Sequence, residues 1–178
     1  MSEPPIVRVL TGTDAEAALA PLSDILLDCV EGGASVSFMA PMERATADGF
    51  WRGVAAGIAA GERIVLAAED PGTRTMLGTV QIVLAQPENQ PHRADLAKML
   101  VRRAARNRGV GAALMRAAEA AALAAGRTLL VLDTASDAAE RLYARAGWVR
   151  VGTVPGYALL PHGGLCDTVF YYKQLAGG

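Results

Sequence analysis

Four arginines and two glycines lie close together near the middle of this 178-residue chain. The arginines fall within seven residues, from position 102 to position 108, and Gly109 and Gly111 follow them. An alanine-rich run with the composition of a helix comes directly after the glycines. Backbone amides at a helix N-terminus bind phosphate, especially where glycine leaves room for close approach. The stretch therefore predicts a pyrophosphate site.

The predicted phosphate contacts are mostly main-chain amides, over Arg106, Asn107, Arg108, Gly109, Val110, Gly111 and Ala112. A solvated basic patch and a nucleic-acid contact are the alternatives for the arginines. The formal net charge of −1 argues against a nucleic-acid footprint over the whole protein, so the basic cluster is local. Arg102 and Arg103 are predicted to face either solvent or a further phosphate.

The spacing of the glycines distinguishes between the cofactors that could be bound. A dinucleotide fingerprint requires a third glycine where Leu114 stands, and it follows its strand without the seven-residue spacer between Val101 and Gly109. Asp133, at the end of the next predicted strand, is the one feature in favour of that fingerprint. A Walker A loop is excluded because no Gly-Lys-Ser/Thr follows.

A strand, a helix and a second strand must position this site. Residues 94–101 form the first strand, and the helix extends from Gly109 to about Ala125, with Gly126 as its C-terminal stop. Residues 127–132 are continuously apolar, which is typical of a strand buried on both faces. The two strands should pair in parallel.

The flanking segments supply further elements. A strand over Ile6–Leu10 precedes a helical pattern that is capped at Thr13 or Asp14 and is split or kinked at Pro21. A helix over 42–60 and a hairpin of strands over 64–68 and 75–84 follow. After a helix ending at Ala146, strands over 149–154 and 168–173 flank a turn-rich segment. We expect one α/β domain over residues 1–178, with a mixed sheet of six or seven strands and helices on both faces.

Two motifs resemble the Gcn5-related N-acetyltransferases, the GNAT family. Arg106-Asn-Arg-Gly-Val-Gly111 is similar to that family's Gln/Arg-x-x-Gly-x-Gly/Ala pattern, and Ala139-Glu-Arg-Leu-Tyr-Ala-Arg-Ala-Gly-Trp148 is similar to its second, tyrosine-bearing segment. They occur in the family's order. The stretch from Leu132 to Thr134, with later residues from Arg150 to Lys173, resembles the tabtoxin-resistance acetyltransferase branch.

The resemblance implies a GNAT-like fold and an N-acetyltransferase that moves the acetyl group of acetyl-CoA directly to a primary amine of a small molecule, such as an antimetabolite or an amino-acid-like compound. It implies that strands over 95–101 and 128–133 splay apart around the pantetheine arm of the cofactor. Backbone groups of Met99, Leu100 and Val101 would then pair with that arm.

The same resemblance implies roles for individual side chains. Tyr143 is the expected general acid toward the leaving thiolate, with a buried helix tyrosine as the alternative. Asp95 is the expected general base, with His92 or a chain of waters as alternatives. Ser136 stands where many relatives place an asparagine that contacts the pantetheine arm. The acceptor pocket is expected to involve the first two helices and the segment 155–167, including Tyr157, His162 and Asp167.

Composition limits the remaining possibilities. Cys29 and Cys166 lack metal-ligand spacing, so no metal site is expected. The chain shows neither a signal-peptide pattern nor an apolar run long enough for a membrane span, which favours a cytoplasmic protein without membrane or nucleic-acid partners. The sequence leaves open whether the chain forms a homodimer. A non-catalytic acyl-CoA-binding regulatory module is the alternative function, and it would not need Tyr143.

Overall fold

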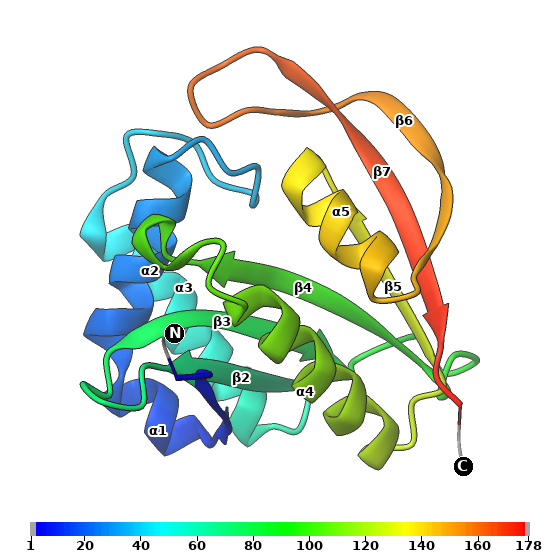
Figure 1. Ribbon diagram of the computed structural model, residues 1–178, viewed down its shortest axis with the longest axis horizontal. Coiled ribbons are helices and arrows are strands. Elements are labelled where there is room, and N and C mark those ends of the chain that lie inside the picture. The colour runs from blue at the N-terminus through cyan, green and yellow to red at the C-terminus, as the bar shows by residue number, and fades with distance from the viewer. Residues whose placement is uncertain (1–2, 177–178) are drawn as a thin grey trace.

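One mixed seven-stranded sheet organises the computed structural model, which describes residues 3–176 (Figure 1). The strand order is β1-β2-β3-β4-β5-β7-β6, and β4 and β5 are the parallel pair. The strands are β1 (Ile6–Leu10), β2 (Arg63–Glu69), β3 (Met76–Val83), β4 (Arg93–Val101), β5 (Leu129–Thr134), β6 (Val149–Leu159) and β7 (Leu165–Gln174). The helices are α1 (Gly12–Ala17), α2 (Leu19–Glu31), α3 (Arg44–Ala59), the short 3-10 turn η1 (Arg103–Ala105), α4 (Val110–Ala124) and α5 (Asp137–Arg145). The predicted mixed sheet with helices is confirmed.

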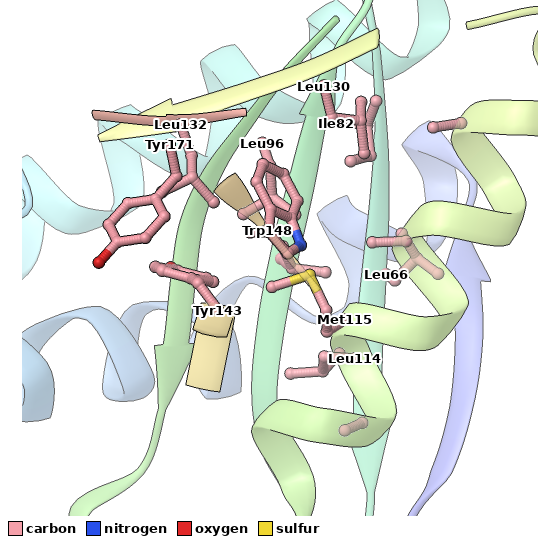
Figure 2. Close-up of a cluster of buried hydrophobic side chains, with 14 of the residues drawn as sticks. Leu66, Ile82, Leu96, Leu114, Met115, Leu130, Leu132, Tyr143, Trp148 and Tyr171 are labelled. Atoms are coloured by element: carbon pink, nitrogen blue, oxygen red, sulfur yellow. The ribbon is translucent and has the colours of Figure 1, made fainter. Parts of the chain in front are cut away.

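Two apolar cores lie on opposite faces of the sheet. On one face, α4 and α5 pack against β2 to β5 and β7 through a cluster that includes Leu114, Met115, Tyr143 and Trp148 (Figure 2). On the other face, α1, α2 and α3 pack against β1 to β4 around the fully buried Trp51. Burial of one large apolar side chain is worth about 1.5–3 kcal/mol, so both clusters contribute strongly to the stability of the sheet.

The second core stops at β4. Among the described residues, its buried members come from β1 to β4 and α1 to α3, and β5 contributes none. Along β5, Leu130 and Leu132 are buried against the α4 side, whereas Leu129 and Val131 are only half-buried on the other face. The prediction that this strand is buried on both faces was therefore wrong. The face of β5 that points away from α4 is only partly covered.

The parallel pair separates near its middle. Direct β4–β5 pairing extends from Arg93 opposite Leu129 to Asp95 opposite Val131, and both strands continue beyond that point. A bulge in β4 accompanies the separation, because two residues, Lys98 and Met99, stand opposite one residue of β3. Lys98 has a φ of 50°, a left-handed conformation that costs a non-glycine residue roughly 1–2 kcal/mol.

The first helical region differs from its prediction in two ways. Thr11, rather than Thr13 or Asp14, is the N-cap, and Asp14 completes a capping box with it. The helix is interrupted at Ala18 and not at Pro21. Pro21 lies in the first turn of α2, where a missing backbone N–H breaks no helical hydrogen bond, so it starts that helix without kinking it.

The C-terminal strands are much longer than predicted. Most of the segment expected to be turns belongs to β6 and β7, which pair as far as Leu159 opposite Leu165. Pro155 and Gly156, which resemble a loop in the sequence, lie at a bulge between Val154 and Ala158. The hairpin tip reaches the loop after α2, where Ala40 N donates to Pro161 O at 2.9 Å (Figure 1).

Candidate active site

The predicted phosphate cradle joins the end of β4 to the start of α4. Gly109 is the N-cap of α4 with a φ of 78°, a conformation that suits glycine because it carries no Cβ. Arg106, Asn107, Arg108 and Gly109 are all exposed. The amides of the first turn of an α-helix lack carbonyl partners within the helix. The loop and the helix start thus present backbone donors to solvent, as an anion site requires.

The four arginines divide into two groups. Arg102 Nε donates to Met76 O at 2.8 Å, and Arg103 donates to the Asp28 carboxylate through both its backbone N and its Nε, each at 2.8 Å. These two arginines fasten the loop to β3 and α2. Arg106 and Arg108 are exposed in the segment that leads into α4, and Arg108 lies 3.4 Å from the Asp70 carboxylate. The second pair is therefore the one beside the exposed helix start.

Asp28 is the acidic half of that anchor. Partial burial opposes ionisation, but the hydrogen bonds and the charge of Arg103 outweigh it and lower the pKa of the Asp28 carboxyl. Because the folded-state pKa lies below the unfolded value, the stabilisation is present above the unfolded pKa of about 3.9 and is lost as the pH falls through the folded one.

Asp28→Asn should lower the free energy of unfolding at pH 7 by about 1 kcal/mol, a modest value because Arg103 is half exposed to solvent. The destabilisation should shrink as the pH falls below 4. Urea titrations at pH 7 and pH 3.5 measure both values, with Asp24→Asn, a more exposed acid on the same helix, as the control. An equal loss at both pH values would contradict the assignment.

The residues predicted to contact a pantetheine arm lie just past the point where β4 and β5 separate. Leu100 pairs with Thr79 and Val101 with Gly78, so one edge of β4 is occupied by β3. Met99 packs against the core under α4, and Leu100 packs in the opposite core. The other edge of β4 faces β5 across the opening. The main-chain groups of Met99 to Val101 are placed where an extended guest chain could pair with them.

Tyr143 belongs to α5, which covers the same face of the sheet as α4. Its ring packs between Trp148 and Tyr171, with centroid distances of 5.8 Å to each (Figure 2). Burial, with the charge of Asp133 as the second cause, raises the pKa of the Tyr143 phenol well above its usual value. The hydroxyl is therefore fully protonated at neutral pH. Tyr143 is both a core side chain and a potential proton donor.

Ser136 is the N-cap of α5, since its Oγ accepts a hydrogen bond from Ala139 N at 3.3 Å. The side chain is thus engaged in starting the helix that carries Tyr143. Its predicted contact with the pantetheine arm stays a prediction.

Asp95 lies at the vertex of the β4–β5 opening. Its carboxylate accepts hydrogen bonds from Gln86 Nε2 at 3.1 Å and from the Arg93 guanidinium. His92, the alternative base, is exposed one residue before β4, and its carbonyl accepts from Thr128 N at 2.8 Å. The predicted base is therefore engaged by two side chains, Gln86 and Arg93.

A pocket lies on the open face of β5, on the side of the sheet opposite α5. It measures about 120 Å³ and combines residues from three segments. The loop after α2 contributes Ser35 and Ser37, the end of β5 contributes Asp133 and Thr134, and the β6–β7 hairpin contributes Tyr157, Cys166 and Thr168. Asp133 accepts a hydrogen bond from Thr168 Oγ1 at 2.8 Å. The pocket thus contains a carboxylate held by one hydroxyl.

The predicted acceptor residues are only partly brought together. Tyr157 lines the pocket, whereas His162 Nε2 lies 2.9 Å from Glu31 O and Asp167 accepts from Gly156 N, so these two hold the hairpin in place. Asp133 and Ser37 were not predicted as site residues. For Asp133 a signal existed, because strand alternation places it on the same face as Leu129 and Val131, away from the core. Ser37 carries no comparable signal.

The described residues contain no cluster of three or more side chains suited to a metal ion. Over residues 3–176, no helix has the length and apolar character that crossing a membrane requires.

Comparison with known proteins places this geometry in a family context. The model of the acetyltransferase (GNAT) family matches residues 25–148, which is more than half of the chain. The fold is similar to that of an N-acetyltransferase from Staphylococcus aureus, with a TM-score of 0.79, 16% identity and coverage of 98% of this chain and 100% of that one.

Two further solved structures are similar. One is a ribosomal-protein-alanine N-acetyltransferase from Brucella melitensis, with a TM-score of 0.77, 24% identity and coverage of 96% and 99%. The other is a phosphinothricin acetyltransferase from Sinorhizobium meliloti in complex with acetyl-CoA, with a TM-score of 0.80, 17% identity and coverage of 99% and 91%.

Proposed function

The chain belongs to the GNAT family of acetyltransferases, and we propose that it transfers the acetyl group of acetyl-CoA to a primary amine of a small molecule. One observation supports the proposal above the others. Direct pairing of β4 with β5 stops at Asp95 and Val131, and beyond that point the chain places the exposed start of α4 after β4 and the pocket at Asp133 at the end of β5. A thioester held along the β4–β5 opening would meet an amine held in the pocket.

Acetyl-CoA would supply the activated acetyl group, and the chain's own residues would position it. The amides from Arg106 to Ala112 would hold the pyrophosphate. The edge of β4 from Met99 to Val101 would pair with the pantetheine arm. The side-chain hydroxyl of Tyr143 would donate a proton to the departing sulfur, since its raised pKa keeps it protonated until that charge develops.

A carboxylate on the pocket side would take a proton from the acceptor's ammonium group, and the free amine would then attack the thioester carbonyl. Asp95 and Asp133 are the two candidates that the fold presents. Asp133 lines the pocket, whereas Asp95 is paired with Arg93. We therefore favour Asp133 as the proton acceptor and place Asp95 second.

The size of the pocket supports a small acceptor. At about 120 Å³ it fits a compact amine rather than a long polymer.

The alternative function is a non-catalytic acyl-CoA-binding regulatory module. Such a module would have the same phosphate cradle but would not turn over acetyl-CoA. Thiol release in a screen of primary amines separates the two functions, because a regulatory module would bind acetyl-CoA and release no thiol.

Acetyl-CoA should bind the wild-type protein in a calorimetric titration, and Arg106→Ala should weaken that binding about tenfold, the effect of roughly 1.4 kcal/mol from one charged contact. Arg52→Ala, which removes an exposed arginine on α3, is the matched control and should bind like the wild type. Absence of any binding by the wild type would overturn the cofactor assignment.

A further inference from the structure

Lys98 stands on the pocket side of the sheet although its sequence position gives it no obvious role. Its Nζ donates to Ser37 Oγ at 3.1 Å, and Ser37 lines the pocket. Its neighbour Met99 packs into the core on the other face, as expected for adjacent residues of a strand. A lysine and a serine are thus joined across 61 positions of the chain at the pocket wall.

The backbone at Lys98 is held in an unfavourable conformation for this placement. Its φ of 50° belongs to the left-handed region, where a bulge residue is usually glycine. A glycine here would adopt the same backbone without strain, but it would place no charge beside Ser37. Strain at a non-glycine residue in a site is consistent with a functional side chain.

Two charged side chains, Asp133 and Arg63, act on the ammonium group of Lys98. Partial burial lowers the pKa of its ammonium group, while the nearby Asp133 carboxylate raises it and the charge of Arg63 lowers it further. Asp133 is itself on the pocket lining, where Thr168 holds it. The pocket region therefore has an anionic group at the end of β5 and a cationic group at the bulge of β4.

We propose that Lys98, with Ser37, binds a carboxylate of the acceptor while Asp133 faces the acceptor's amine, so that the enzyme selects zwitterionic, amino-acid-like amines over amines without an acidic group. This inference rests on the proposed acetyltransferase function. Lys98 supplies a charge-assisted hydrogen bond, and Ser37 Oγ, which accepts from Lys98 Nζ, supplies a second donor through its own hydroxyl hydrogen. A partly buried ammonium group gains more from such a partner than an exposed one, because water screens the pair less.

The first test is turnover with matched acceptors. L-amino acids and their carboxamides share an amine and a side chain and differ in the acidic group, and thiol release measures kcat/KM for each pair. The wild type should prefer the acid by ten- to a hundredfold. Lys98→Met should reduce the acid-to-amide ratio at least tenfold, and Lys98→Arg should restore part of it. A wild type that prefers the amides, or a Lys98→Met variant with an unchanged ratio, would overturn the assignment.

The second test does not depend on turnover. The chain has two lysines, Lys98 and Lys173, so protein labelled with ¹³C at lysine Cε gives two resolved side-chain signals that Lys98→Met assigns. Lys173 is paired with Glu119 at 2.7 Å, away from the pocket, and serves as the internal control. In CoA-loaded protein, N-acetylglycine should shift the Lys98 signal, and N-acetylglycinamide should leave it in place.

The two tests separate the failure of each idea. A Lys98 signal that shifts with N-acetylglycine, without thiol release from any amine, would support the carboxylate site and contradict the acetyltransferase proposal. Thiol release together with a Lys98 signal that does not move when N-acetylglycine is added would support the acetyltransferase activity and overturn the role of Lys98.

Discussion

Tyr143→Phe should lower kcat by about 10²- to 10⁴-fold, the usual contribution of a positioned general acid, while acetyl-CoA affinity stays close to that of the wild type. The substitution keeps the ring that packs against Trp148 and Tyr171 and removes only the hydroxyl. The free energy of unfolding should therefore change little. Steady-state kinetics at saturating acetyl-CoA, calorimetry and urea unfolding provide the three measurements.

Tyr171→Phe is the matched control for this variant. Tyr171 belongs to the same aromatic cluster (Figure 2). Its hydroxyl donates to Glu140 at 2.5 Å, and neither residue lines the pocket. Its removal should leave kcat near the wild-type value. Equal losses in both variants would assign the effect to packing of the aromatic cluster and would remove Tyr143 from proton transfer.

Asp133→Asn should lower kcat/KM by about 10²- to 10⁴-fold, and Asp95→Asn by less than about tenfold, if the pocket carboxylate takes the proton. Both substitutions preserve size and remove charge. Acetyl-CoA affinity, measured in parallel, should be similar in the two variants.

The reverse outcome would be equally informative. A large loss in Asp95→Asn with a small one in Asp133→Asn would return the base to the vertex of the β4–β5 opening. In that case Arg93 and Gln86 would act by orienting Asp95, and the pocket at Asp133 would serve acceptor binding alone.

The geometry of the proposed cofactor half of the site could be predicted from the sequence because it depends on local features. A strand, a spacer, Gly109 and an alanine-rich helix follow each other along the chain, and the cradle forms wherever that helix begins. The helix around Tyr143 was predictable for the same reason, since Ser136 caps it and Gly147 follows its end at Ala146.

The proposed acceptor half was not predictable in the same way. Its pocket needs Ser37, Asp133 and Thr168, which meet only after α2, β5 and β7 have packed. The bulge at Lys98 was also missed, because the run from Ala94 to Val101 reads as one continuous strand and no glycine marks the left-handed residue. The long hairpin was predicted as turns because Pro155 and Gly156 interrupt its pattern without ending the pairing.

The contact between the β6–β7 hairpin and the loop after α2 has a consequence for how acceptor preference could diverge among relatives. Ala40 meets Pro161, and Ser35 meets Cys166 at 3.8 Å across 131 positions of the chain. Ser35 and Cys166 both line the pocket, so the two segments share one wall of it. A change in one segment alters the shape that the other must fit. Exchanging both segments together between homologues should therefore transfer substrate preference, whereas exchanging either one alone should mainly impair the enzyme, and neither exchange touches the residues from Arg106 to Ala112.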